Sequence, residues 1–302
     1  IATIAYTQEA LTGASHKKVG PRFIPKILGN IAAANIAIDY NIQGPSFTVS
    51  TACSSGGDAI NTACMCMQSG KADIMLAVGA ESVLCPLVIY SLANAKALSR
   101  RNDSPSTASR PFDVTRDGFV IGEGGGALVL ETEEHALARG AKIYAEIRGC
   151  GNTDDAYHVT APHPEGRGAI ACMKQAIAEA GINPADIGYI NAHGTATNKG
   201  DTVETSSIKK VFGDTLPYVS STKGATGHMM GAGGITETIT CIKAIETGTV
   251  PPTINLNEVD PECAGIDFVA NTAKKAEINF AMSNAFGFGG QNSSIIVGKY
   301  GK

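Results

Sequence analysis

The stretch VSTACSSGGDAI, residues 49–60, places one cysteine between a β-branched run and a cluster of small residues that opens a helix-like segment. A cysteine at a helix start is a candidate nucleophile, because unpaired backbone N–H groups and the helix dipole favour the thiolate there. The same N–H groups can bind an oxyanion, and the small residues after Cys53 leave room for a substrate. Alone, a cysteine after a strand is only a weak sign of catalysis.

Two histidines and a lysine also follow strand-like runs. His193 comes just after the run 187–191, at the kind of position where α/β folds bind ligands. His228 lies in a glycine-rich segment, five residues after Lys223. A lone histidine is more often a structural hydrogen-bonding residue than a catalyst, so both interpretations stay open. Because Lys223 precedes the glycines, the phosphate loop G-x-x-x-x-G-K-[ST] is absent, and nucleotide binding is a weak alternative.

Three further motifs have a plain structural interpretation. The segment SNAFGFGGQN, residues 283–292, predicts either a packed turn or a movable gate over a pocket. The segment GEGGGA, residues 122–127, matches a dinucleotide fingerprint, but a strand-like run follows where the motif needs a helix, so we expect a close-packed turn. Cys64 and Cys66 lack a second ligand pair at zinc spacing, so we expect buried helix residues and no metal.

Composition limits the class of protein. The chain has 302 residues, of which 43% are hydrophobic and 17% are charged, and its net charge is −4. This describes a soluble globular protein of one large domain or two packed halves, and its acidity argues against nucleic-acid binding. No apolar run predicts membrane insertion and no secretory signal is visible, so we expect a cytoplasmic protein whose eight cysteines are reduced. The first residue is Ile and not Met, as in a fragment or in a sequence with trimmed numbering.

Short apolar runs alternate with helix-like runs, which predicts a layered α/β fold. The segments VSTACSSGG and VSSTKGATGH each end a strand and enter a helix. This similarity arises either by chance or by an ancient duplication in which two helix starts face one site. The expected strands are 47–50, 74–78, 127–131, 143–147, 187–191, 218–220 and 294–297, and the expected helices include 58–68, 168–180 and 235–245.

In their order and combination, these segments resemble the elongating β-ketoacyl-acyl-carrier-protein synthases of type II fatty-acid biosynthesis, which belong to the thiolase superfamily. The resemblance covers roughly residues 20–297. It implies a layered α-β-α-β-α fold with pseudo-duplicated halves, 1–150 and 151–302, from which the family's N-terminal portion is missing. The motifs that carry it are GPSFTVSTACSSG, KALSRRNDSPSTASRPFDVTRDGFVIGEGGGALVLE, YINAHGTATNKGD, SSTKGATGHMMGAGG and NAFGFGGQN.

The resemblance implies a decarboxylative Claisen condensation of malonyl-acyl-carrier protein with an acyl chain held on Cys53. In this scheme His193 and His228 assist decarboxylation and stabilise the enolate. Lys223, with Glu237 as its partner, orders the histidines. The backbone N–H groups of Cys53 and Phe288 form the oxyanion hole. The remaining implied roles are the gate (Phe286 and Phe288), pantetheine binding (Thr195 and Thr197), carrier-protein contact (Lys17, Lys18 and Lys96) and the acyl pocket (Val88 and Leu92).

The implied partners are an acyl-carrier protein and a second copy of the chain, with no nucleic acid, no metal and no resident cofactor, since the phosphopantetheine arm arrives on the carrier. The sequence leaves a polyketide ketosynthase and a catalytically silent fragment or dimerisation partner as alternatives. A cysteine hydrolase using Cys53 and His193 gives no reason for Lys223, His228 or the gate. The sequence does not indicate the preferred acyl length.

Overall fold

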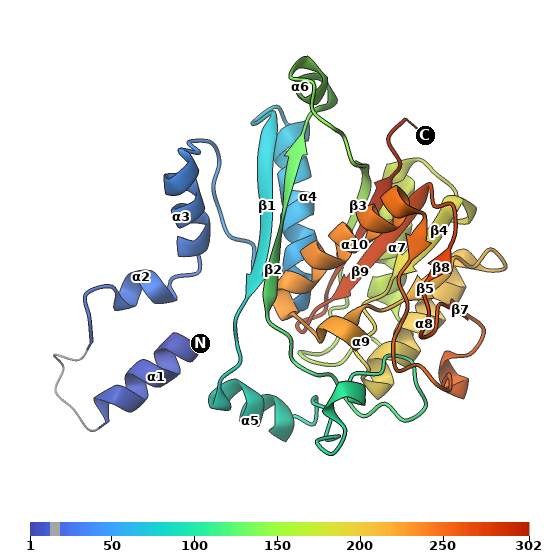
Figure 1. Cartoon of the computed structure of the whole chain (residues 1–302), viewed down its shortest axis with the longest axis horizontal. Coiled ribbons are helices and arrows are strands. Elements are labelled where there is room, and N and C mark those ends of the chain that lie inside the picture. The colour runs from blue at the N-terminus through green and yellow to red at the C-terminus, as the bar shows by residue number, and fades with distance from the viewer. Residues whose placement is uncertain (13–18, 302) are drawn as a thin grey trace.

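The computed structural model describes residues 1–12 and 19–301 of the chain (Figure 1). Its largest sheet has the strand order β3-β10-β9-β4-β5-β7. β3, β10 and β9 pair antiparallel, whereas β9, β4, β5 and β7 pair parallel. The bounds are β3 (Glu146–Asp154), β4 (Ile187–Asn191), β5 (Tyr218–Ser220), β7 (Asp267–Phe268), β9 (Phe280–Phe286) and β10 (Gln291–Gly298).

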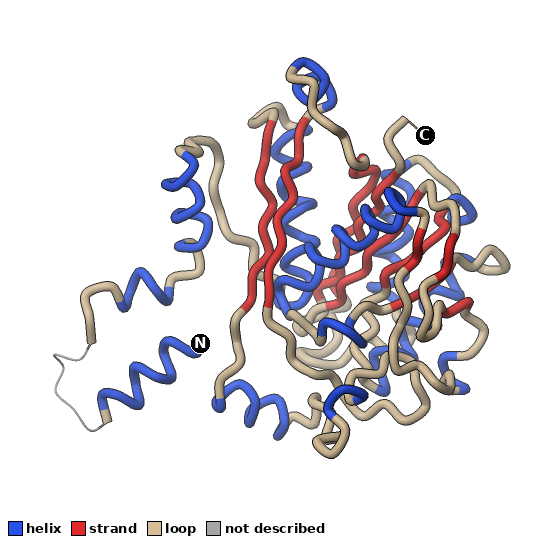
Figure 2. Tube along the Cα trace, in the orientation of Figure 1, coloured by secondary structure: helices blue, strands red, loops and turns tan. Residues whose placement is uncertain are grey.

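A second sheet consists of β1 (Ile74–Glu81) and β2 (Gly124–Glu131), which pair antiparallel from Ile74↔Glu131 to Glu81↔Gly124. Between the two sheets lie the helices α4 (Ser55–Gln68) and α10 (Gly233–Thr247), and Figure 2 shows these blue helices flanked by red strands. A small third sheet pairs β6 (Thr249–Val250) with β8 (Lys274–Lys275). The chain therefore stacks strands and helices in alternating layers.

The outer face of the large sheet is covered by α7 (Arg167–Ala180), which packs on β3 and β10 and against α8 (Asn198–Phe212). Helices α1, α2 and α3 lie apart from this body in Figure 1, and none of their residues is buried. The remaining helix bounds are α1 (Ala2–Leu11), α2 (Phe23–Ile27), α3 (Ile31–Tyr40), α5 (Pro86–Asn94), α6 (Glu133–Ala138) and α9 (Lys223–Thr226).

Two apolar cores lie on the two faces of the large sheet. Ile295 of β10 packs with Ile60 of α4 and Ile235 of α10, whereas its neighbour Ile296 packs with Met173 of α7. A strand buried on both faces needs consecutive apolar residues instead of alternating ones, because successive side chains point to opposite faces. This explains why the run 294–297, with three consecutive apolar residues from Ile295 to Val297, predicts a strand.

Most of the expected elements are present, with three differences. Residues 47–50 form no strand, because no strand among the described residues pairs with them and a strand needs a partner for its hydrogen bonds. The strand expected at 143–147 begins at Glu146, where pairing with β10 starts. The glycines 124–126 do not form a turn: they are the first residues of β2 and pair with β1.

The N-terminal turns of α4 and α10 approach each other backbone to backbone. A Cβ atom at Gly56 would lie 2.6 Å from the backbone nitrogen of Ile235, and one at Gly234 would lie 2.5 Å from that of Gly57. These distances are too short for any side chain, so glycine at both positions sets how closely the two helices pack. The resulting pair of helices carries Cys53 and His228 on the segments that lead into it.

We predict that Gly56→Ala destabilises the protein by roughly 1–3 kcal/mol, the usual cost of overpacking, even though alanine is the better helix former. The measurement is the urea midpoint of unfolding. Gly29→Ala is the matched control, because nothing lies within 4 Å of a Cβ atom at Gly29. Equal midpoints for the two variants would show that the helices separate without cost.

Candidate active site

Cys53 lies in a sharp turn at the start of α4. The turn is the short 3₁₀ segment η2 (Ala52–Ser54), and Ala52 has φ +51°, a left-handed conformation that is costly for alanine. Hydrogen bonds within the turn hold this conformation. The hydroxyl of Ser54 donates to the carbonyl of Thr51 at 2.7 Å, and the hydroxyl of Ser55 donates to the carbonyl of Ala52 at 2.7 Å. The thiol is therefore presented at a fixed position, with only 8% of Cys53 exposed.

His228 is the direct partner of the thiol. Its Nε2 atom lies 3.1 Å from Cys53 Sγ, which is hydrogen-bond distance for sulfur. The backbone of His228 is held on both sides, since its N–H donates to the carbonyl of Val120 at 2.7 Å and its carbonyl accepts from Gly122 at 2.9 Å. The ring of Phe119 packs edge-on against the imidazole at 5.3 Å. The imidazole is thus buried and fixed beside the sulfur.

His193 follows β4 and faces the same point. The centroid of its ring lies 5.3 Å from that of His228, with the planes at 86°, and 5.8 Å from that of Phe286. The backbone N–H groups of His193 and Gly194 donate to the two carboxylate oxygens of Glu204, at 2.8 and 2.7 Å. Glu204 on α8 therefore fixes the loop that carries the histidine.

Sequence reasoning missed Glu204 and its neighbour Asp201. Both carboxylates are buried on α8, and Asp201 accepts from the backbone N–H groups of Phe112 and Ala196 at 2.8 and 3.1 Å. Burial raises the pKa of Glu204 to about 7 and that of Asp201 to about 6. The only signal in the sequence is a pair of acids three residues apart, GDTVE, and such a pair usually marks a solvated helix face.

Lys223 and Glu237 form a buried ion pair. The lysine begins α9, the carboxylate comes from α10, and the two side chains bond directly with 1% and 5% of their surface exposed. The carbonyl of Lys223 accepts from the hydroxyl of Ser109 at 2.6 Å. Lys223 therefore bonds to the partner that the resemblance implies. Neither residue of the pair lines the cavity, so their effect on the site is electrostatic and structural.

Burial determines the protonation states of Cys53, His193 and His228 when no substrate is bound. It raises the pKa of the Cys53 thiol to about 11, although the N–H of Phe288 and the charge of Lys223 act in the opposite direction. Burial also lowers the pKa of both His193 and His228 well below the ordinary value, and the charge of Lys223 lowers both further. The backbone N–H groups at the helix start favour the thiolate, but the loss of hydration on burial disfavours it more strongly. At neutral pH the site holds a thiol and two neutral imidazoles.

The oxyanion-hole and gate residues lie on two different elements. The backbone N–H groups of Phe288 and of Cys53 itself both point at the thiol and lower its pKa. Phe288 lies in the turn 287–290 between β9 and β10, with 39% of its surface exposed. Phe286 is instead the last residue of β9 and pairs with Asn292 of β10. A moving gate can therefore consist of Phe288 and its turn, whereas Phe286 is held in the sheet.

A cavity of about 1060 Å³ brings most of the predicted residues together. Thr195 and Thr197 lie on its wall, with their hydroxyl oxygens 3.1 Å apart. Lys17 and Lys18 fall outside the described residues. Glu237 and Lys223 lie behind the wall. The predicted residues that line the cavity are Cys53, Val88, Leu92, Lys96, His193, Thr195, Thr197, His228, Phe286 and Phe288.

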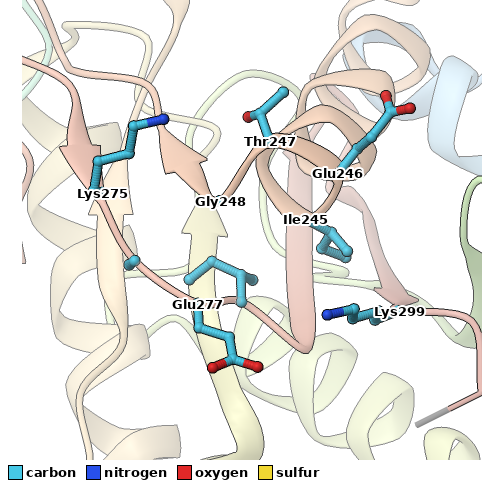
Figure 3. Close-up of a pocket in the computed structure, with 9 residues that line it drawn as sticks. Ile245, Glu246, Thr247, Gly248, Lys275, Glu277 and Lys299 are labelled. Atoms are coloured by element: carbon cyan, nitrogen blue, oxygen red, sulfur yellow. The ribbon is translucent and has the colours of Figure 1, made fainter.

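A second, shallower pocket of about 560 Å³ lies at the C-terminal end of α10 and contains none of the predicted site residues (Figure 3). Glu246, Lys275 and Lys299 at its rim give it a mixed charge. Over the described ranges, no cluster of three or more histidine, cysteine or acidic side chains could hold a metal ion. Within the same residues, no helix combines the length and apolar character needed to cross a membrane.

A buried thiol bonded to one imidazole, with a second imidazole facing the same cavity, is the arrangement of a cysteine-dependent acyl-transferring enzyme. Residues 2–136 match the family model described as "Beta-ketoacyl synthase, N-terminal domain", and residues 144–257 match "Beta-ketoacyl synthase, C-terminal domain". The chain therefore belongs to the β-ketoacyl synthase family. This confirms the family resemblance. The division of the chain into halves at residue 150 stays a prediction.

Among curated relatives, the chain is 48% identical over 287 residues to the 3-oxoacyl-[acyl-carrier-protein] synthase 2 of Rhizobium meliloti (strain 1021), covering 94% of this chain and 68% of that protein. It is 46% identical to the mitochondrial 3-oxoacyl-[acyl-carrier-protein] synthase of Arabidopsis thaliana, covering 93% and 62%. The chain thus spans about two thirds of the length of these relatives.

Solved structures of several ketosynthases resemble the fold. A β-ketoacyl synthase from Burkholderia phymatum STM815 superposes with a TM-score of 0.93 at 36% identity, covering 99% of this chain and 72% of that one. A type II polyketide ketosynthase, solved in complex with its acyl-carrier protein, gives a TM-score of 0.91 at 36% identity, covering 94% and 70%. The thiolase-like α/β fold expected from the sequence is confirmed.

We predict that alkylation of Cys53 by iodoacetamide accelerates about tenfold per pH unit between pH 7 and 9.5. Only the thiolate reacts, and a pKa of about 11 keeps the thiol mostly protonated across this range. The rate is measured by mass spectrometry of the Cys53 peptide. An unstructured peptide with the same local sequence is the control, and its rate should level off near the ordinary cysteine pKa of about 8.5. A plateau for the protein below pH 9 would mean that the helix start outweighs burial.

Proposed function

We propose that this protein condenses malonyl-acyl-carrier protein with an acyl chain held on Cys53, releasing CO₂ and forming β-ketoacyl-acyl-carrier protein in fatty-acid elongation. The observation that carries the proposal is the contact of 3.1 Å between Cys53 Sγ and His228 Nε2, with His193 facing the same cavity. The relatives named 3-oxoacyl-[acyl-carrier-protein] synthase 2, at 43–48% identity, support this reaction over its alternatives.

In the first half-reaction the acyl chain moves from the carrier to Cys53. The thiol passes its proton to the sulfur of the leaving pantetheine, by way of the imidazole of His228. The bond between Cys53 Sγ and the acyl carbon forms while the bond to the pantetheine sulfur breaks. Negative charge develops on the carbonyl oxygen, and the N–H groups of Cys53 and Phe288, which already point at the sulfur, are placed to stabilise it.

In the second half-reaction the malonyl group loses CO₂. The bond to its carboxylate carbon breaks, and the electron pair forms an enolate whose oxygen accepts hydrogen bonds from His193 and His228. The enolate carbon attacks the acyl carbonyl on Cys53, the carbon–sulfur bond breaks with its electron pair going to sulfur, and the thiolate takes up a proton from water. Two neutral imidazoles suit this role, because each carries one N–H donor and adds no net charge to the buried site.

The remaining cavity residues fit the groups that this reaction brings. Thr195 and Thr197 offer paired hydroxyls along the wall, suited to the amides of a phosphopantetheine arm. Val88 and Leu92 of α5 offer apolar surface to an acyl chain. No resident cofactor is needed, since the arm arrives on the carrier protein. A homodimer and a cytoplasmic location are part of the proposal.

A polyketide ketosynthase is the second candidate, because a type II polyketide ketosynthase matches the fold with a TM-score of 0.91, and two ketosynthases paired with a chain length factor match it with TM-scores of 0.92 and 0.85. Their identity to this chain, 32–36%, is lower than that of the fatty-acid relatives. The two functions differ in the product. A fatty-acid enzyme adds one malonyl unit to a reduced chain, whereas a polyketide enzyme adds units to a chain that keeps its keto groups.

We predict that mixing this protein with an acyl-carrier-protein thioester adds the mass of the acyl group to Cys53, and that Cys53→Ala abolishes the increment. Intact-protein mass spectrometry measures it. Adding malonyl-acyl-carrier protein should then remove the increment and yield a β-ketoacyl product. A folded protein that gains no mass would support the alternative of a catalytically silent partner, and release of free acid would support a hydrolase.

We predict that Lys96→Glu raises the KM for an acyl-carrier-protein thioester roughly three- to tenfold and leaves the use of a small pantetheine thioester unchanged. Lys96 is exposed at the cavity mouth, and reversing an exposed charge that faces an acidic carrier turns a weak attraction into repulsion. Lys71→Glu is the matched control, because Lys71 is also exposed but lies beyond the C-terminal end of α4, away from the nucleophile. Equal losses with both substrates would exclude Lys96 as a carrier contact.

A further inference from the structure

A buried carboxylate lies in the first turn of α4, five residues after the nucleophile. Asp58 is 3% exposed, and each of its oxygens has one partner. Oδ2 accepts from the hydroxyl of Thr51 at 2.5 Å, and Oδ1 accepts from the side-chain amide of Asn152 at 2.6 Å. The carboxylate therefore links the nucleophile turn to β3. No step of the proposed reaction uses this link.

The Thr51 end of this link lies where the two parts of the oxyanion hole meet. The carbonyl of Thr51 accepts from both the N–H and the hydroxyl of Ser54. The turn that carries Phe288 packs against the same carbonyl, since a Cβ atom at Gly287 would lie 2.7 Å from it and 3.3 Å from the nitrogen of Cys53. A shift of Thr51 therefore moves the Cys53 N–H relative to the Phe288 N–H.

The β3 end of the link leads to the other N–H donor. Asp155, the residue after β3, donates its N–H to the carbonyl of Gly290 at 2.9 Å, and Gly290 belongs to the turn of Phe288. Asn152 and Asp155 lie three residues apart on one stretch of backbone. That stretch thus holds the nucleophile turn through Asp58 and the gate turn through Gly290. The N–H groups of Cys53 and Phe288 are therefore both positioned relative to the same stretch of backbone.

A positioning role also explains why a charged group occupies this place. Burying a carboxylate away from water costs free energy, which two hydrogen bonds offset only in part. An apolar side chain would fill the space at less cost. The carboxylate differs in accepting two short, directed hydrogen bonds. Ala52, next to Thr51, has a costly backbone conformation that such surrounding contacts must maintain.

We infer that Asp58 is a positioning residue that sets the Cys53 N–H against the Phe288 N–H, through Thr51 on one side and Asn152 on the other. The inference rests on the proposed function, because it concerns the oxyanion formed during acyl transfer. It extends that function by adding a residue that touches neither substrate nor thiol. Its effect belongs to the transition state of acylation and not to the reactivity of the thiol itself.

Two reactions of the Cys53 sulfur distinguish an effect on the transition state of acylation from an effect on the reactivity of the thiol. Acylation by a thioester passes through a tetrahedral oxyanion, whereas alkylation by iodoacetamide displaces iodide and forms none. We expect Asp58→Asn and Asn152→Asp each to slow acylation roughly ten- to a hundredfold, the size seen when an oxyanion donor is misplaced. Alkylation at the same pH should stay within about twofold. The exchanged pair Asp58→Asn with Asn152→Asp should recover most of the acylation rate, because one amide again faces one carboxylate.

Variants of Thr51 keep the test valid if the Asp58 variants fail to fold. Thr51→Val removes the hydroxyl and should slow acylation but not alkylation. Thr51→Ser keeps the hydroxyl and should retain the acylation rate. Thr62→Val is the matched control, because the Thr62 hydroxyl bonds only the carbonyl of Asp58 within α4. The CD spectrum and unfolding midpoint of each variant report its fold.

Three outcomes decide between the possibilities. Slow acylation with normal alkylation, recovered in the exchanged pair, supports the positioning role. Unchanged acylation in the single variants, or a parallel fall of both rates, overturns it and assigns Asp58 to the stability of the turn. A wild-type protein that iodoacetamide alkylates but no thioester acylates overturns the proposed function, and this inference with it.

Discussion

Two helix ends that meet backbone to backbone set the distance on which this site depends. α4 and α10 touch through Gly56 and Gly234, and the residues just before each helix carry the thiol and its imidazole. A side chain at either glycine would push the helices apart and lengthen the Cys53–His228 contact. The two sheets on either side fix the same helices from outside through their apolar cores. The reactive pair is thus positioned by packing, and its own hydrogen bond is a result of that packing.

Close packing gives the site a low polarity, and this low polarity determines which groups in the site carry charge. With its thiol and imidazoles neutral at rest, the site accumulates charge only while bonds are changing. The N–H donors are in place before that charge appears, so little reorganisation is needed when it does. The ion pair of Lys223 and Glu237 lies behind the residues that line the cavity. It keeps a fixed positive charge near the histidines without placing a cation in the cavity.

Some features of the fold and site can be predicted because a short motif marks their place in the chain, whereas others depend on partners that the local sequence does not show. His193 can be found because it follows the end of the buried strand β4, where α/β folds gather their ligands. Cys53 can be found from the helix start that follows it, although none of the described residues before it forms a strand. Residues 47–50 have the composition of a strand, but strand formation depends on a partner that local composition does not reveal. The glycines 124–126 are read as a turn because glycine favours turns, yet in β2 they serve close packing against neighbouring residues.

The supporting carboxylates are the hardest part to predict. Glu204 and Asp58 lie on helices whose exposed faces also carry polar residues, and hydrophobic periodicity does not distinguish a solvated acid from a buried one. Glu204 accepts from backbone N–H groups 10 and 11 residues earlier, across a loop, and Asp58 accepts from Asn152, which is 94 residues away. Only the tertiary structure brings these groups together. The angle between the two imidazole rings is equally invisible in the sequence.

The contact between Cys53 and His228 joins residues 175 positions apart in the chain. At 5–20 residues per second, a ribosome needs roughly 10 to 35 s to add the histidine after the cysteine. Throughout that interval the chain lacks His228, Glu237 and the turn of Phe288, so the site that buries the sulfur and raises its pKa is incomplete and leaves the thiol more open to oxidants. The resistance of the finished site to stray electrophiles is therefore acquired only after His228 and the turn of Phe288 have been added. The newborn chain depends on the reducing power of its compartment to reach that point with its nucleophile intact.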